Sequence, residues 1–438
     1  MTGRGIRTIG RWLGVCAVLA LLAAGAPAAI PETERQALID LYLATGGDAW
    51  THNDNWLLPG DPGQFNFPGT ENTWYGVTTD AENTTVVKLN LYWNGLSGPL
   101  PESVSGLSNL QELDLSANGL AGAIPASFGT MTSLQVLNLM SNRFSGAIPE
   151  PLGNLPQLKT LYLGGNQLTG AIPDSLGNLS QLEFLSLRFN QLTGAIPASL
   201  GQLSQLYSLN LSVNRLTEIP EALSALSELR WLNLAGNQFS GPLPAWLGNL
   251  NQLESLHLSN NSFSGPIPAS FRNLANLQTL YLDINGGLDG VLPAGLGDLS
   301  QLTSLSISRT SISGPIPPEL GRLTQLEYLN LYRNALSGEI PPELGGLAAL
   351  KSLNLSMNQL TGPLPDTFGD LASLTSLDLS ENRLSGPIPD SWAGLTALRY
   401  LTLYRNQLSG PLPAWLGELS ELIALNLWVN EFTGPIPD

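Results

Sequence analysis

The residue types that could carry out catalysis are scarce in this chain. Its histidines are His52 and His257, which are separated by most of the sequence, and its single cysteine is Cys16. The two histidines alone cannot form a metal triad, and the cysteine lies within the segment that reads as an export signal. No Gly-x-Ser-x-Gly elbow follows a strand, and no phosphate-binding glycine loop precedes a long helix. Carboxylates are plentiful, so a glycosidase-like carboxylate pair is the catalytic arrangement left open. We expect a protein that is not an enzyme and needs no cofactor.

One group of oxygen-bearing side chains could in principle bind calcium. It consists of Asp48, Asn53, Asp54, Asn55 and Asp61. Calcium prefers carboxylate and amide oxygens, but this spacing matches no defined calcium loop. Asn and Asp are also the residues that favour tight turns. We therefore expect turns here and no metal site.

Side chains suited to recognition are more prominent than those suited to catalysis. Tyr, Trp and Arg anchor many protein interfaces. One group lies in the middle of the chain: Tyr162, Phe184, Arg188, Phe189, Trp231, His257, Tyr281 and Asp283. A second group lies toward the C-terminus: Tyr328, Tyr332, Arg333, Tyr400, Tyr404, Arg405 and Trp428. Tyr92 and Trp93 form a smaller third group. We take the first two groups as ligand-binding candidates; alternatively, their rings only stack across strands and stabilise a sheet.

A repeated segment positions these residues. Its pattern is Leu-x-Leu-x-x-Asn-x-Leu-x-Gly-x-Ile-Pro, and it occurs about fifteen times with a period of 24 residues. One interval of 23 residues precedes Asn237, and one of 25 precedes Thr310, which replaces the asparagine. Such regularity is the signature of a solenoid in which each repeat packs on its neighbours. An indel at either irregular repeat would bend the array or open a loop.

Each part of the repeat has a physical role. In Leu137-Asn138-Leu139 the alternation turns both leucines inward and the intervening side chain outward, which predicts a short strand. The recurrent asparagine should bond backbone groups of its own turn and of the next repeat, because a buried amide without partners is costly. Gly and Pro in Gly170-Ala171-Ile172-Pro173 end the strand, and a helical turn follows. The outward positions before each asparagine then form one surface.

The repeats resemble the plant-type leucine-rich repeats of receptor-kinase ectodomains and polygalacturonase-inhibiting proteins. The resemblance covers about residues 87–438 and carries no kinase. It implies an α/β repeat solenoid, a leucine-rich repeat horseshoe or superhelix with parallel strands on its concave face. It also implies that the concave face binds a protein, peptide or glycan. The family's shared residues are structural, so the ligand cannot be named from them.

Residues 29–86 are expected to form an N-terminal cap that covers the first repeat. Thr33 and Gln36 suggest a capping box, and Gly46-Gly47 should end the helix that follows. Trp50, Trp56 and Trp74 should cover the edge of the core, and the segment between the last two either shields that edge or forms a binding loop. The stretch Trp74-Tyr75-Gly76-Val77-Thr78-Thr79 resembles the family's cap motif, but Asn72 and Thr79 stand where a cysteine pair is usual. No cap is evident after the last repeat.

The N-terminus reads as an export signal. Arg4, Arg7 and Arg11 precede an apolar stretch from residue 12 to 24, and small residues allow cleavage after Ala28. The alternative is a retained membrane anchor. We expect residues 1–28 to be a signal peptide and the protein to be secreted or at the cell surface, in an extracellular or periplasmic setting, without membrane insertion after cleavage.

Charge narrows the list of partners. The net charge is −17, which disfavours nucleic acids and anionic membrane surfaces. We expect an extracellular recognition module for a protein, peptide or glycan. The alternative is a structural or surface-active protein, for example an ice-binding or adhesive one, that uses ranks of polar residues such as Ser97, Thr169, Thr193, Ser313 and Ser409. The uncapped C-terminal repeat also suggests end-to-end self-association.

Overall fold

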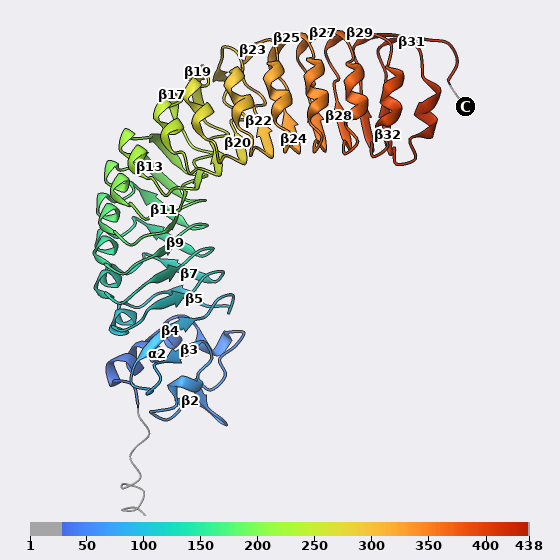
Figure 1. Cartoon of the computed structure of the whole chain (residues 1–438). Coiled ribbons are helices and arrows are strands. Elements are labelled where there is room, and N and C mark those ends of the chain that lie inside the picture. The colour runs from blue at the N-terminus through green and yellow to red at the C-terminus, as the bar shows by residue number, and fades with distance from the viewer. Residues whose placement is uncertain (1–28, 437–438) are drawn as a thin grey trace, which may run out of the picture. The chain divides into compact units, whose positions relative to one another are not determined.

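The structure is a computed structural model that describes residues 29–436 (Figure 1). The predicted signal peptide, with Cys16, lies outside these residues. The chain forms two compact units. Unit 1 contains the described residues up to Ser145 together with Pro151–Leu158, and unit 2 contains Gly146–Glu150 and the residues from Lys159 onward.

Unit 1 begins with the one long helix among the described residues, α2 (Glu32–Ala44). Pro31 precedes it, and a proline is well suited to starting a helix because its φ is already close to the helical value. The predicted capping box is therefore wrong: Thr33 lies inside the helix, and Gln36 hydrogen-bonds further along it. The predicted end of the helix is confirmed, because Gly46 adopts a φ of 73°, the left-handed conformation that follows many helices.

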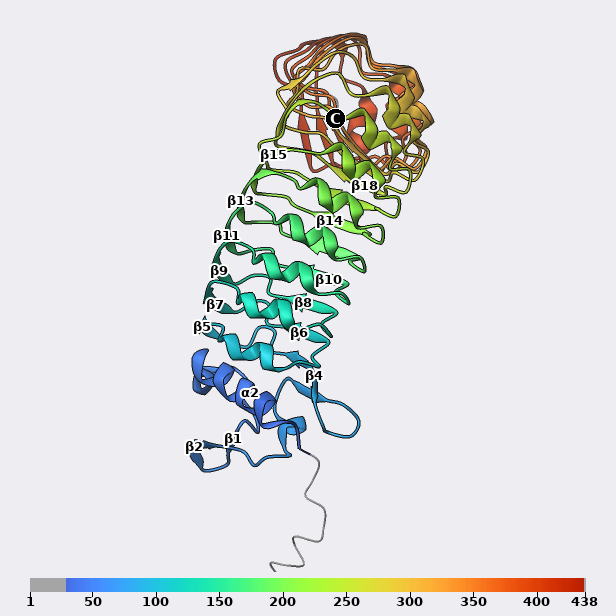
Figure 2. The same ribbon diagram turned by 90° about the vertical axis from the view of Figure 1, so that its left-hand side faces the viewer.

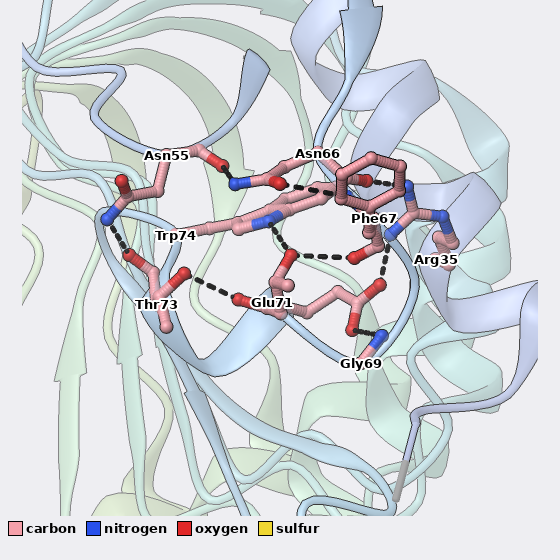
Figure 3. A network of polar contacts seen from close by, with 9 residues as sticks. Arg35, Asn55, Asn66, Phe67, Gly69, Glu71, Thr73 and Trp74 are labelled. Atoms are coloured by element: carbon pink, nitrogen blue, oxygen red, sulfur yellow. Dashed lines mark hydrogen bonds and ion pairs between the residues drawn. The ribbon is translucent and has the colours of Figure 1, made fainter. Parts of the chain in front are cut away.

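A buried ion pair holds α2 against the following segment (Figure 3). Arg35 pairs with Glu71, and both side chains are almost fully buried. Arg35 also donates to the carbonyl oxygen of Asn66, and Glu71 accepts from the backbone N–H of Gly69 at 2.8 Å. The guanidinium lies 5.1 Å from the ring centroid of Trp74. Each charge therefore has several partners, as burial requires.

The predicted tryptophan cluster is buried. The ring of Trp56 lies 5.1 Å from that of Trp50 and 4.9 Å from that of Trp74, centroid to centroid. The segment between Trp56 and Trp74 forms the antiparallel strands β1 (Leu57–Leu58) and β2 (Asp61–Phe65). Phe65 packs on Trp74 with centroids 6.2 Å apart. This contact favours the shielding role over the binding loop.

Asn83 connects Asn72 and Thr79, the two positions at which the family that these repeats resemble usually has a cysteine pair. The amide of Asn72 donates to Oδ1 of Asn83 at 2.9 Å, and the hydroxyl of Thr79 donates to the same oxygen at 2.7 Å. Thr79 ends strand β3 (Val77–Thr79). One side-chain oxygen therefore joins the segments that a disulfide would have linked.

Each repeat contributes one main strand, and consecutive main strands pair within each unit. In unit 1, β3 is antiparallel to β4 (Val86–Asn90), which is followed in parallel by β6 (Glu112–Asp114) and β8 (Val136–Asn138). In unit 2 the main strands are all parallel and lie in sequence order: β10 (Thr160–Tyr162), β12 (Phe184–Ser186), β14 (Ser208–Asn210), β16 (Trp231–Asn233), β18 (Ser255–His257), β20 (Thr279–Tyr281), β22 (Ser304–Ser306), β24 (Tyr328–Asn330), β26 (Ser352–Asn354), β28 (Ser376–Asp378), β30 (Tyr400–Thr402) and β32 (Ala424–Asn426). The predicted parallel strands are confirmed.

The predicted helical turns are short 3-10 helices that line the other face of each unit (Figure 2). Leucines of these turns and of the strands are buried between the two faces, as Leu176 and Leu185 illustrate. The helical turns of the repeats are Glu102–Gly106, Ala126–Thr130, Glu150–Asn154, Asp174–Asn178, Ala198–Gln202, Glu221–Ala225, Ala245–Asn249, Ala269–Asn273, Ala294–Asp298, Pro318–Arg322, Pro342–Gly346, Asp366–Asp370, Asp390–Gly394 and Ala414–Glu418. Three helical elements precede them in sequence: the longer α2 and the shorter 3-10 turns Gly47–Ala49 and Glu71–Thr73.

The predicted asparagine ladder is present. The amide of Asn382 donates to the carbonyl oxygen of Leu379 at 3.1 Å and to that of Leu355, in the preceding repeat, at 3.0 Å. Its oxygen accepts from the backbone N–H of Leu360 at 3.0 Å. Thr310 stands in place of one of these asparagines and has no side-chain amide group. It keeps a part of the ladder, since its hydroxyl donates to Oδ1 of Asn334 at 2.5 Å.

A second set of strands follows the ladder asparagines and is interrupted at the irregular repeats. In unit 2 these strands do not form one continuous sheet. The sheet is broken between β15 and β17, around the 23-residue interval, and between β21 and β23, around the 25-residue interval. A pocket of about 270 Å³, lined by Glu218 and Ser240 among others, lies at the first interruption. These strands are β5 (Ser97–Pro99), β7 (Gly119–Gly122), β9 (Arg143–Gly146), β11 (Gln167–Gly170), β13 (Gln191–Ala195), β15 (Arg215–Glu218), β17 (Ser240–Pro242), β19 (Ser262–Gly265), β21 (Gly287–Leu288), β23 (Ser313–Gly314), β25 (Ala335–Glu339), β27 (Gln359–Pro363), β29 (Arg383–Gly386), β31 (Gln407–Pro411) and β33 (Glu431–Thr433).

Candidate ligand-binding surface

The outward side chains of the main strands, with the residues that flank each strand, form what we call the sheet face of unit 2. In the repeat of Asn190, Phe184 and Ser186 lie on β12, and Arg188 and Phe189 follow it. Phe189 has a φ of 52°, and the non-glycine residue before the ladder position is left-handed in most repeats. Bulky residues rarely adopt this conformation, so the turn displays a side chain here at some conformational cost.

An aromatic cluster crosses three neighbouring strands of the sheet face. Tyr207 contacts Phe184 on one side, with centroids 5.7 Å apart, and Trp231 on the other, at 4.5 Å, both edge to face. The guanidinium of Arg230 lies 5.2 Å from the centre of the Tyr207 ring and donates to Glu254 at 2.6 Å. We call Phe184, Tyr207, Arg230 and Trp231 the central cluster. It joins Phe184 and Trp231, two of the sequence-predicted residues.

Tyr207 and Arg230 were not among the residues predicted from the sequence. Both lie one residue before a main strand, outside the alternating positions from which candidates were chosen. The signal available was periodic: Lys159, Glu183, Tyr207, Arg230 and Glu254 occupy the same place in successive repeats. Long side chains at this place reach the sheet face because diagonal neighbours in a sheet lie within their range.

A small pocket adjoins the central cluster. It has a volume of about 190 Å³ and is lined by Trp231, Asn233, Ser255 and His257 together with residues of β14. The ring of His257 lies 4.6 Å from that of Tyr281. Burial lowers the pKa of His257, and the nearby Asp283 carboxylate opposes part of that shift. The imidazole is thus favoured in its neutral form, which can both donate and accept a hydrogen bond.

Asp283 makes several bonds inside the protein. One carboxylate oxygen accepts from the hydroxyl of Ser306 at 2.5 Å and from the hydroxyl and backbone N–H of Ser308 at 2.6 and 2.8 Å. The other accepts from Ser259 at 3.3 Å. Much of its capacity is therefore used to join adjacent strands, and less of it remains to meet a ligand.

The remaining central candidates lie beside the cluster. Burial raises the pKa of Tyr162, on β10. Arg188 crosses over Gly164, where an added Cβ would come within 2.8 Å of its Cγ, and its guanidinium lies 5.8 Å from the ring centre of Phe189. Phe189 and Arg188 are exposed, and they extend the surface toward the end of the strands where the asparagine ladder lies.

Four of the seven C-terminal candidates take part in two assemblies. The guanidinium of Arg309, which the sequence analysis did not select, lies 5.6 Å from the ring centre of Tyr332. Further along, Tyr404 stacks on Trp428 with centroids 5.0 Å apart and an interplanar angle of 7°. Arg405 lies 5.1 Å from the ring centre of Trp428 and pairs with Glu381 at 3.2 Å. Two partners of these side chains, Arg309 and Glu381, emerge only from the structure.

The third aromatic group belongs to unit 1. Trp93 is 73% exposed beside an open pocket of about 440 Å³ whose walls include Thr51, Ser97 and Arg143. Tyr92 is also exposed. The sheet face of unit 2 offers the larger array of contacting aromatic and cationic side chains.

Metal-binding side chains are dispersed in the described part of the chain. Within residues 29–436, no group of three or more His, Cys, Asp or Glu side chains is arranged to hold a metal ion. In the Asp48 group, Asp48 accepts from the hydroxyl of Tyr42 at 2.9 Å, and the amide of Asn55 donates to the carbonyl oxygen of Thr73 at 2.8 Å. Such bonds agree with the expected turns. No helix in this part of the chain is long and apolar enough to cross a bilayer.

Comparison with known proteins identifies the family. A family model described as leucine-rich repeat matches residues 84–144, 132–192, 187–239 and 348–408, and a leucine-rich repeat region model matches residues 219–340. A leucine-rich repeat protein of Leptospira interrogans is 31% identical with a TM-score of 0.66, covering 79% of this chain and 90% of its own. The chain belongs to the plant-type leucine-rich repeat family.

Plant receptors resemble this leucine-rich repeat protein as well. PEPR1, solved with AtPEP1, is 37% identical with a TM-score of 0.84, covering 93% of this chain and 56% of its own. The plant peptide hormone receptor RGFR1, solved with RGF2, is 33% identical with a TM-score of 0.69, covering 81% and 65%. The chain thus spans about half to two thirds of these receptors. No curated protein matches it. The predicted leucine-rich repeat solenoid is confirmed.

Proposed function

We propose that this leucine-rich repeat protein is a non-enzymatic recognition module that binds a peptide or protein segment across the sheet face of unit 2, outside the cell or at its surface. The observation that carries the proposal is the central cluster beside the His257 pocket. Trp231 remains 38% exposed there although it lies on an inner strand of the sheet. A partly exposed aromatic side chain beside a pocket is the usual anchor of an interface.

The relatives support a peptide or protein ligand. RGFR1 was solved with RGF2, and the receptor kinase HAESA, at 29% identity and a TM-score of 0.58, with a peptide hormone ligand. The central cluster and the C-terminal assemblies supply the aromatic and cationic side chains that such a ligand would contact. Binding of a glycan instead of a peptide is one of the outcomes that the test below distinguishes.

The surface-active alternative has weaker support. Its polar rank lies on the second set of strands, with Thr169 and Thr193 in one ladder of unit 2, and Ser313 and Ser409 in another. A lattice-matching face requires uniform spacing, and the interruptions at the irregular repeats remove it. The same interruptions leave the main strands of unit 2 continuous.

The test is capture of partners from extracellular and envelope extracts of the source organism. The mature protein is compared with a variant in which Arg188, Trp231, Tyr332 and Arg405 are changed to alanine, and with a control that changes the helix-face Arg322. We expect a protein or peptide to be retained by the first and by the control and lost by the quadruple variant. A glycan retained in the same way would replace the peptide in the proposal, and identical capture by all three forms would overturn it.

A further inference from the structure

The C-terminal part of the sheet face contains the same group of residues twice. Tyr328, Tyr332 and Arg333 stand at the same positions of their repeat as Tyr400, Tyr404 and Arg405 do in theirs. Tyr328 pairs in register with Ser352, which pairs with Ser376, which pairs with Tyr400. We call the two groups the brackets; they are three strand spacings, or about 14 Å, apart.

The floor between the brackets is low and polar. The two intervening strands present Ser352 and Asn354 on β26 and Ser376 and Asp378 on β28. Ser356 and Ser380, which follow these strands, are almost fully buried. Their hydroxyls donate to Asn354 and Asp378 respectively, each at 2.6 Å. The two serine hydroxyls therefore have acceptors within the floor, and the side chains of the floor are shorter than the tyrosines on either side. Tyr328 and Tyr400 are each nearly half exposed.

Each bracket presents a guanidinium that is accessible to a ligand. Arg333 is exposed and forms no ion pair with another described residue. Arg405 pairs with Glu381 at 3.2 Å, but its side chain is 53% exposed. An ion pair this exposed contributes little, so a ligand carboxylate could take the place of Glu381.

Basic residues are concentrated on the sheet face of unit 2, in contrast to the acidity of the whole chain. Near the brackets, Lys351 is neutralised by Glu327, whereas Arg309 and Arg399 have no ion-pair partner in the described part of the chain. The basic residues of this face are Lys159, Arg188, Arg230, Arg309, Arg333, Lys351, Arg399 and Arg405, and they outnumber the acidic residues of the same face, which are Glu183, Glu254, Asp283, Glu327, Asp378 and Glu381. This distribution favours an acidic segment at the brackets, and arginine binds carboxylates in a bidentate manner.

The distance between the brackets matches a periodicity of extended peptides. Side chains at positions i and i+4 of a strand point to the same side and lie about 13 Å apart, close to the distance between the brackets. We propose that the brackets bind one extended peptide segment that carries two Asp or Glu side chains four residues apart, one carboxylate at Arg333 and the other at Arg405. This inference rests on the proposed function and names the ligand class for that part of the surface.

The test uses the full chain and blocked, fluorescein-labelled nonapeptides of serine and glycine, measured by fluorescence anisotropy. One peptide has Glu at positions 3 and 7, a second at 3 and 6, and a third has Gln at 3 and 7. We expect the first to bind about tenfold more tightly than the second, which loses one charge-assisted bidentate contact worth about a factor of ten, and about a hundredfold more tightly than the third, which loses both. Equal affinities for the three peptides would overturn the proposal.

Matched variants test the roles of the residues. Arg333→Ala should abolish the preference for the first peptide, Arg333→Lys should keep part of it, and Arg322→Ala on the helix face should change nothing. Glu381→Ala should strengthen binding by several-fold because it removes the competing carboxylate at Arg405, an effect that a purely structural role would not produce. Unchanged affinity in both Arg333→Ala and Arg405→Ala would contradict the proposal.

Failure of this inference is distinguishable from failure of the proposed function. If an extract partner depends on Trp231 but is unaffected by alanine at Arg333 and Arg405, recognition stands and the bracket proposal falls. If no variant of the sheet face alters capture while the spaced peptide still binds selectively, the brackets stand and the wider recognition surface falls. Thermal unfolding of each variant shows that it remains folded.

Discussion

Tyr207 and Trp231 contact edge to face on adjacent strands, with ring centroids 4.5 Å apart and an interplanar angle of 77°. Tyr207 also contacts Phe184 and lies beneath the guanidinium of Arg230. It is therefore the residue that holds the central cluster together, and its ring orients the partly exposed Trp231.

The first prediction concerns this support. Tyr207→Ala should lower the free energy of unfolding by about 1–2 kcal/mol, because aromatic pairs contribute about 0.5–1.5 kcal/mol beyond buried area. It should also weaken partner capture, because Trp231 loses the ring that orients it. Tyr207→Phe should preserve both properties. Urea denaturation and the capture assay measure the two effects, and full capture by Tyr207→Ala would show that the orientation of Trp231 is immaterial.

The second prediction concerns the buried pair in unit 1. Glu71→Ala should destabilise the protein by about 3–5 kcal/mol, because it leaves Arg35 buried without its counter-ion. Arg405→Ala, which breaks an exposed pair, should cost about 1 kcal/mol or less. Denaturant unfolding followed by tryptophan fluorescence reports the loss, since Trp74 lies against Arg35. Similar effects of the two substitutions would contradict the difference in burial.

The third prediction concerns pH. The pKa of His257 is lowered in the folded state by burial, so its neutral form contributes stability that is fully present above the unfolded pKa of about 6.5. That stability should be lost as the pH falls through the lower, folded pKa. His257→Gln should reduce this part of the pH dependence between pH 7.5 and 5. Thermal unfolding at a series of pH values measures it, and identical profiles for both proteins would argue against a neutral, half-buried histidine.

The fourth prediction concerns the position of the missing disulfide. Asn83→Ala removes the acceptor shared by Asn72 and Thr79, and should cost about 1–3 kcal/mol if both bonds are lost. Thr79→Val removes one of the two bonds and should cost less. Chemical denaturation gives both values. A larger cost for Thr79→Val than for Asn83→Ala would mean that Asn83 is not the connecting residue.

Much of the fold could be predicted from the repeat itself. Buried leucines, parallel strands and the asparagine ladder follow from local alternation and from a period that nearly every repeat keeps. The start of α2 could not be read in the same way, because Pro31 and the capping-box pattern at Thr33 are competing local signals. The interruptions of the second set of strands coincide with the repeats whose length departs from 24 residues.

The sequence by itself determined which side of each strand faces the core and therefore most of the candidate binding residues. Only the tertiary structure decided how those side chains combine. Tyr207 joins Phe184 to Trp231, the carboxylate of Asp283 is engaged by Ser306 and Ser308, and Arg405 meets Glu381. The physical reason is that strand alternation is a property of one repeat, whereas these contacts depend on the register between repeats and on the left-handed turn that sets each exposed side chain at the edge of the sheet.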